Sequence, residues 1–267
     1  MTSLLLGPEE TSALAPQRSP FLWLVEREVL RYLRIWRYAL VGPILSTVLF
    51  VIVFGTILSR RIDVGGISYG RFIVPGLIAQ TVLNVGYFNG TTSLFEARRD
   101  RYLNDVLASP LRWWEINAAL VLAAALRGLI SAAAVMAVAV PLTGIGVERP
   151  GYALLAGAGL LLLTAQVGVV AGTLARSLDH IHSIESLVIL PLGFFGGIFY
   201  PLHQLAPKWR WLSEMNPFFW LVQATREAFL GFSDVPAWAG LAVVWAAALA
   251  VSGWAAYLFG ASRRLKP

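Results

Sequence analysis

The sequence predicts an all-α integral membrane protein with six transmembrane helices. Of its 267 residues, 57% are hydrophobic and only 13% are charged, and the mean hydropathy is +0.68. A chain of this composition cannot cover itself with a water-compatible surface, which excludes a soluble domain. Its apolar residues also gather in runs of about 20, the length that a helix needs to cross the hydrocarbon core of a bilayer.

Six stretches approach or reach this length, and the fifth is the shortest. They run over Tyr38–Leu58, Phe72–Leu94, Ile116–Leu142, Tyr152–Leu174, Ile184–Tyr200 and Ala237–Phe259. Together they predict one transmembrane domain over residues 38–262.

The positive charges predict the orientation of this domain. Most of the 21 Lys and Arg residues fall on the side of the N-terminus, with clusters at 27–37, 98–101 and 263–266. Because positively charged loops stay in the cytoplasm, both termini are expected there. Residues 1–20 are then a flexible cytoplasmic segment, and residues 263–267 are a short cytoplasmic tail.

Residues 21–37 predict an amphipathic helix ahead of the first span. Apolar residues recur on one helical face, and arginines lie largely on the other. The apolar face holds Leu22, Val25, Val29, Leu33 and Trp36, and the basic face holds Arg27, Arg31 and Arg34. Such a helix lies in the inner interface of the membrane, with its arginines toward lipid phosphates or a partner protein.

A second amphipathic helix is predicted over residues 94–109, between the second and third spans. Phe95, Tyr102, Leu103 and Leu107 have helical spacing, and Pro110 ends the pattern. A short helix with one apolar and one charged face, held at the cytoplasmic boundary, is suited to docking another protein.

The segment 201–236, between the fifth and sixth spans, is too long for a structureless loop. Asn216 can cap a helix there, and Pro217 can occupy its first turn. We expect re-entrant helices on the outer side of the membrane.

Arg127 is the one charge deep inside a predicted span. An intramembrane charge is a candidate functional residue by default. The alternatives are direct contact with a substrate and a structural ion pair within the bundle, for which Glu185 is a candidate partner.

Several kinds of active site are excluded. The chain has no cysteine, and neither of its lysines, Lys208 and Lys266, follows a glycine as a phosphate-binding loop requires. His180 and His182 form an H-x-H pair but lack further ligands, so an ordinary polar loop is the better interpretation. We therefore expect no catalytic, cofactor or metal site. Because the basic residues lie between apolar runs, no nucleic-acid partner is expected either.

Glycines and aromatic residues mark surfaces within the membrane. Gly168 with Gly172, and Gly193 with Gly197, have the spacing that lets helices approach closely. A set of aromatic side chains in the second and fifth spans could border a path for a greasy or sugar-bearing substrate, although core packing explains most aromatics in membrane helices. The set comprises Tyr87, Phe88, Phe194, Phe195, Phe199 and Tyr200.

Several motifs together resemble the permeases of type-2 ABC exporters. The stretch 191–232 reads PLGFFGGIFYPLHQLAPKWRWLSEMNPFFWLVQATREAFLGF, with Asn216-Pro217 followed by Arg226. The segment FEARRDRYLNDVLASPLRWWEINAAL and the Arg127-Gly128 pair are also similar to that family. The likeness extends over roughly residues 20 to 262.

The resemblance implies a homodimer in a bacterial inner membrane, bound to two separate ATPase subunits that hold ATP and magnesium. The helix at 94–109 would be the coupling helix that enters the ATPase, and residues 21–37 the connecting helix. The expected ATPase-docking residues are Phe95, Glu96, Arg98, Arg99, Arg101, Tyr102, Leu103, Asp105 and Leu107. Asn216, Pro217 and Arg226 would belong to the external re-entrant motif.

The expected function is the membrane subunit of an ATP-driven exporter without its own catalytic centre. Its substrate would be a drug, a lipid or a lipid-linked glycan, and membrane lipid is an expected partner. A membrane lipid or glycan transferase and a secondary carrier are the alternatives.

Overall fold

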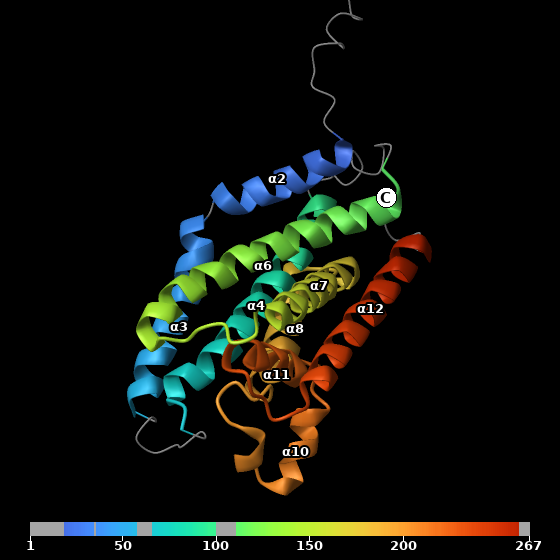
Figure 1. Ribbon diagram of the computed structural model, residues 1–267. Helices are drawn as coiled ribbons and strands as arrows, with labels where there is room; N and C mark the ends of the chain where they lie inside the picture. The colour runs from blue at the N-terminus through green and yellow to red at the C-terminus, as the bar shows by residue number, and fades with distance from the viewer. Residues whose placement is uncertain (1–18, 35, 58–65, 100–110, 262–267) are drawn as a thin grey trace, which may run out of the picture.

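A computed structural model describes residues 19–34, 36–57, 66–99 and 111–261, and the regular elements in these ranges are helices (Figure 1). In chain order they are α2 (Pro20–Arg34), α3 (Trp36–Ile57), α4 (Tyr69–Arg99), α6 (Trp113–Thr143), α7 (Pro150–Leu174), α8 (Leu178–Ile184), the π-helix η1 (Glu185–Ile189), α9 (Leu190–Phe194), the 3-10 helix η2 (Leu202–Gln204), α10 (Pro207–Glu214), α11 (Pro217–Leu230) and α12 (Ala237–Ala261). The predicted tails at 1–20 and 263–267 lie outside these ranges, apart from Ser19 and Pro20.

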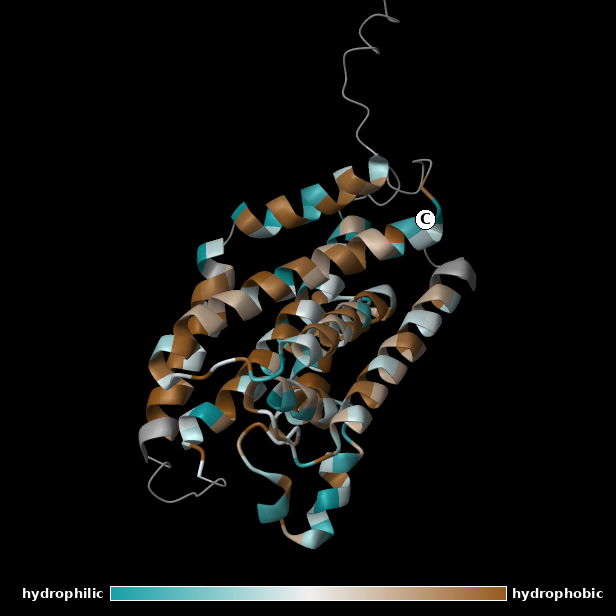
Figure 2. Cartoon of the chain, viewed as in Figure 1, coloured by the Kyte–Doolittle hydropathy of each residue, from teal (hydrophilic) through white to brown (hydrophobic). Residues whose placement is uncertain are grey.

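Four helices, α4, α6, α7 and α12, are long and apolar enough to cross a membrane. A fifth span results if α2 and α3, which meet at a bend of 59°, are counted as one broken span. The all-helical membrane architecture is therefore confirmed. Figure 2 shows apolar residues along the long helices and many polar residues on α2 and α10.

The fifth predicted stretch, Ile184–Tyr200, differs from the helix that forms. Helical structure begins earlier, at Leu178, passes through the π-helix η1 and ends at Phe194. A tight turn follows, in which Gly197 has a φ of +73°, a conformation that L side chains rarely adopt. The Gly196-Gly197 pair lies in this turn, so the helix ends six residues before the predicted end of the span at Tyr200.

The centre of the bundle is α4, the most deeply buried of the membrane-length helices. It packs against α3, α6, α7 and α11, and its closest neighbour is α7. These four helices surround α4, which runs from the end of the molecule that holds α10 and α11 to the end that holds α2 (Figure 1).

Small residues permit the close approach of α4 and α7. A Cβ atom on Gly168 would lie 2.6 Å from the carbonyl oxygens of Gly86 and Tyr87, and one on Gly172 would lie 2.8 Å from the oxygen of Thr91. The packing role predicted for Gly168 and Gly172 is confirmed, and their partner is α4 of the same chain. Two backbones without side chains between them give the close contact that drives association in lipid, where the hydrophobic effect is absent.

A valine at Gly168 is expected to separate α4 from α7, because the new side chain would meet backbone that cannot rotate away. We expect Gly168→Val to lower the free energy of unfolding by roughly 1 to 3 kcal/mol, the usual range for overpacking. Thermal melting of the detergent-purified protein measures this. Gly157→Val on the same helix is the control, since a Cβ there meets nothing within 4 Å. Equal melting temperatures for the two variants would contradict the packing role.

Candidate functional site

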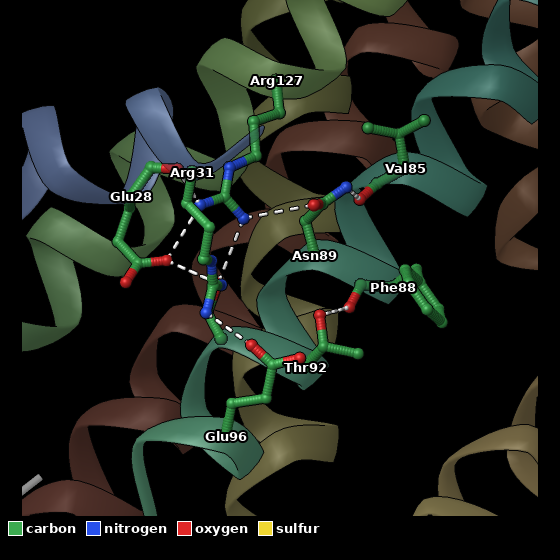
Figure 3. A network of polar contacts seen from close by, with 9 residues as sticks. Glu28, Arg31, Val85, Phe88, Asn89, Thr92, Glu96 and Arg127 are labelled. Atoms are coloured by element: carbon green, nitrogen blue, oxygen red, sulfur yellow. Dashed lines mark hydrogen bonds and ion pairs between the residues drawn. The ribbon is translucent and has the colours of Figure 1, made fainter. Parts of the chain in front are cut away.

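A buried ion pair joins α2 to α6 (Figure 3). Arg127 Nη2 lies 2.8 Å from Glu28 Oε2, and both side chains are only 1% exposed. The same nitrogen donates a hydrogen bond to the backbone carbonyl of Glu28. The guanidinium carbon lies 5.8 Å from the ring centroid of Tyr32, whose hydroxyl shares a hydrogen bond with Ser131 at 2.6 Å. Charge, hydrogen bonds and an aromatic contact therefore hold α2 on α6.

The pair also reaches α4. Arg127 Nη1 donates to Asn89 Oδ1 and to Ser93 Oγ, each at 3.1 Å. Ser93 Oγ donates in turn to Glu28 Oε2 at 2.9 Å. Three helices thus meet around one carboxylate that is sealed from solvent.

Arg31 extends the network to the end of α4. Its Nη2 lies 2.9 Å from Glu28 Oε2, and its Nη1 lies 2.6 Å from Glu96 Oε2 (Figure 3). Arg31 is one-third exposed, so this part of the network is open to water and weaker than the buried pair. Arg31 nevertheless links α2 to Glu96, which is one of the residues expected to dock an ATPase.

The predicted partner of Arg127 was wrong. Glu185 lies beside His182, with 3.4 Å between Oε2 and Nδ1, and Glu28 takes its place at Arg127. The reason is the rotation of α2, which turns one acidic residue inward.

The face of α2 that packs on the bundle differs from the apolar face predicted for residues 21–37. The buried residues of α2 are Leu24, Val25, Glu28 and Tyr32, which have helical spacing. Leu22, Leu33 and Trp36 of the predicted apolar face are 58%, 41% and 51% exposed. Because Glu28 must reach Arg127, α2 turns Leu22 and Leu33 outward, where lipid can cover them. Trp36 is exposed at the start of α3.

The residues predicted to dock an ATPase fall into two groups. Phe95, Glu96, Arg98 and Arg99 belong to the last turns of α4, which continues unbroken to Arg99. The other five lie outside the described residues: Arg101, Tyr102, Leu103, Asp105 and Leu107. The predicted helix at 94–109 therefore begins as an extension of the second span.

Arg98 makes contacts within the chain. Its guanidinium donates to the carbonyl of Thr173 at 3.2 Å, to that of Ala175 at 3.0 Å and to that of Gly172. These are carbonyls at the C-terminal end of α7, which carries partial negative charge. Arg98 therefore fastens the end of α4 to the end of α7.

At the opposite end of α4, Arg226 of α11 occupies a second buried polar cluster. Its side chain is 0% exposed. Nη2 donates to the carbonyl of Gly197 at 2.7 Å, and Nη1 lies 3.4 Å from Asp234 Oδ2. The guanidinium carbon also lies 4.0 Å from the ring centroid of Phe72 in α4. One side chain thus joins α4, α11, the turn after α9 and the loop before α12.

Asn216 and Pro217 begin α11 as predicted. Asn216 Oδ1 accepts a hydrogen bond from the backbone of Phe218 at 2.9 Å, and Nδ2 donates to the carbonyl of Leu192 at 2.8 Å. Pro217 occupies the first helical turn, where its missing N–H is not needed. The Asn-Pro and Arg positions of the external motif therefore fix both the start and the packing of α11.

The aromatic residues predicted to border a substrate path separate into buried and exposed groups. Tyr87 is fully buried, and its hydroxyl donates to the carbonyl of Ile181 at 3.0 Å. The Tyr200 hydroxyl lies 3.0 Å from Ser213 Oγ, and Phe199 packs among other phenylalanines. The exposed residues are Phe88, Phe194 and Phe195, with exposed fractions of 40%, 56% and 49%. Tyr87 thus serves helix packing.

A polar stripe on α4 was not predicted from the sequence. Gln80, Asn84, Phe88 and Thr92 follow one another at intervals of four residues, so they share one face of the helix. Gln80 Nε2 donates to Asn84 Oδ1 at 3.0 Å, and this face carries the exposed surface of the middle of α4. Four-residue spacing of amides inside a predicted span was the available signal.

Comparisons with known proteins find a matching family and similar sequences. The family described as ABC-2 type transporter matches residues 19–230. The inner membrane transport permease YadH of Escherichia coli (strain K12) is 34% identical over 211 residues, which cover 79% of this chain and 82% of that protein. Nodulation protein J of Neorhizobium galegae is 24% identical over 238 residues, or 85% of this chain and 87% of that protein.

Removal of Arg127 is expected to destabilise the protein, because the buried Glu28 carboxylate would keep only the partly exposed Arg31 as a counter-charge. We expect Arg127→Met to lower the free energy of unfolding by about 3 to 5 kcal/mol, and the double variant Glu28→Leu with Arg127→Met to recover much of that loss. Thermal melting in mild detergent measures both.

Arg112→Met, at an exposed position before the same helix, serves as the control and should melt like the parent protein. If the double variant is as unstable as the sum of both single variants, the two charges do not stabilise each other and the account of the pair fails.

Proposed function

This chain belongs to the ABC-2 type transporter family as a multi-pass permease of the cytoplasmic membrane, and we propose that it drives export by docking a separate ATPase. Two copies would form the translocation path, and each would bind one ATPase that supplies ATP and magnesium. The observation that carries the proposal is the continuity of α4. This one helix is mostly buried in the bundle, but it carries both the exposed polar stripe and the end that would lie at the cytoplasm.

The contacts at the end of α4 support a role in transmission. Any force applied to the residues after Arg99 acts on a helix that is already fastened to α7 through Arg98 and to α2 through Glu96. The buried Glu28–Arg127 pair continues this connection to α6. A shift of the docking segment would therefore move four helices together, as a packed two-state element requires.

The polar stripe of α4 supports a role in the path. Amide side chains that face hydrocarbon are unfavourable, so Gln80 and Asn84 are better placed against water, substrate or a partner chain than against lipid. Phe88 lies on the same face and adds an aromatic surface, next to His182 of α8 at 6.2 Å between ring centroids. Such a mixture of amides and aromatic rings suits an amphiphilic cargo such as a drug, a lipid or a lipid-linked glycan.

The proposal predicts different consequences for two arginines of the docking segment. Arg101→Glu should reduce the amount of ATPase that co-purifies with the tagged permease by at least tenfold and leave its melting temperature unchanged. Arg98→Glu should lower the melting temperature itself, because a carboxylate would face the carbonyls at the end of α7.

The measurement is affinity purification from mild detergent, with ATP hydrolysis and the ratio of nucleotide-binding subunit to permease as readouts. Arg101→Lys, which keeps the charge, is the matched control. A permease that never retains an ATPase, or an Arg101→Glu variant that retains it normally, would overturn the proposed docking segment.

A further inference from the structure

A groove of about 480 Å³ lies between α6 and α7. Most of its lining is apolar, with Ala125 and Leu129 from α6 and Ala158 and Leu161 from α7 among its walls. Leu129 is 51% exposed, so the groove is open toward the outside of the bundle. Figure 2 shows predominantly apolar residues along these two helices.

Two amide side chains line the same groove and have unused hydrogen-bonding atoms. Asn117 of α6 is 9% exposed and Gln166 of α7 is 4% exposed. Asn117 Oδ1 and Gln166 Oε1 are buried acceptors with no hydrogen-bond partner in the described part of the chain. The Gln166 amide nitrogen is oriented by Ser252 Oγ of α12 at 3.3 Å, which leaves its oxygen for another donor. Buried acceptors of this kind normally have partners, so they point to a ligand that brings a donor.

The two amides lie toward the α2 end of the bundle. Asn117 is about 6 Å along α6 from Trp113, and Gln166 lies in the C-terminal half of α7. Trp113 and Trp114 are 43% and 48% exposed, as is typical of residues at a membrane interface. From Asn117 to Leu129 the groove follows α6 for about 18 Å, close to half the thickness of a bilayer including its interface.

The groove continues toward the opposite side of the membrane. A smaller cavity of about 190 Å³ shares Leu129 and Leu161 with it and reaches Thr225 and Phe229 of α11. Its walls are apolar as well, so an acyl chain that fills the groove finds further apolar surface at its far end.

We propose that this groove binds a phospholipid of the inner leaflet whose headgroup carries a hydrogen-bond donor. Both oxygens are closed to the groove in this conformation, so each amide would turn toward it for the headgroup amine or hydroxyl to donate to Asn117 Oδ1 and Gln166 Oε1. One acyl chain would lie along Ala125 and Leu129. An apolar helix of a second protein would cover the walls but bring no donor to the two oxygens. A phosphocholine headgroup has no N–H or O–H group and is expected to bind poorly.

The test needs no ATPase, so its failure and the failure of the proposed docking segment are distinguishable. The purified full-length permease is incubated in detergent with equal amounts of phosphatidylethanolamine, phosphatidylglycerol and phosphatidylcholine of matched acyl chains. Native mass spectrometry then counts the lipids that each chain retains. We expect retention of a lipid with a headgroup amine or hydroxyl, at least fivefold over phosphatidylcholine.

Two kinds of variant distinguish the contribution of the apolar groove to lipid binding from the contribution of the two amides. Ala125→Trp fills the groove and should abolish retention, whereas Ala250→Trp, at an exposed alanine of α12 outside the groove, should not. The double variant Asn117→Leu with Gln166→Leu keeps the apolar walls and should remove the preference among headgroups.

Equal retention by Ala125→Trp and Ala250→Trp would overturn the location of the site. A headgroup preference that survives in the double leucine variant would overturn the role of the two amides. Melting temperatures measured in parallel confirm that each variant is folded before its lipids are counted.

Discussion

The Glu28–Arg127 pair is the interaction on which the arrangement at the α2 end depends. An arginine this deep in a membrane helix is tolerated only if a counter-charge and further acceptors surround it, and here α2 and α4 provide both. The pair determines which face of α2 is buried. It thereby decides that Arg31 stands beside Glu96 and that apolar residues such as Leu22 face outward.

Both ends of α4 are fastened by arginines that contact backbone carbonyls. At one end Arg98 bonds to the last carbonyls of α7, and at the other Arg226 bonds to Gly197 and covers the ring of Phe72. Tyr69 adds a hydrogen bond from the first turn of α4 to the carbonyl of Phe199. Between these ends, glycines let α4 lie directly on α7. Such a helix moves as a rigid body together with its neighbours.

Hydropathy predicted most of the long helices, the Asn-Pro pair predicted the start of α11 at Asn216, and glycine spacing predicted the packing of Gly168, because these features depend on local sequence. The partner of Arg127 could not be predicted in this way, since it depends on how α2 rotates against α6. The inner contacts of Arg98 and Tyr87 were missed for the same reason: whether a helical side chain faces a neighbour or a partner depends on tertiary packing. The early end of the helix at Phe194 depends on the Gly196-Gly197 turn, which the apolar composition concealed.

In the proposed mechanism, α4 carries the ATP-driven motion to the translocation path. The chain has no cysteine, so a single spin label at Asn84→Cys reports the distance between the two α4 helices of an assembled dimer. In the complex with its ATPase, a non-hydrolysable ATP analogue is expected to shift this distance. The distance between two labels at Trp238→Cys, an exposed position of α12, is expected to shift less. An active complex in which the Asn84 distance stays constant through nucleotide binding would contradict this mechanism.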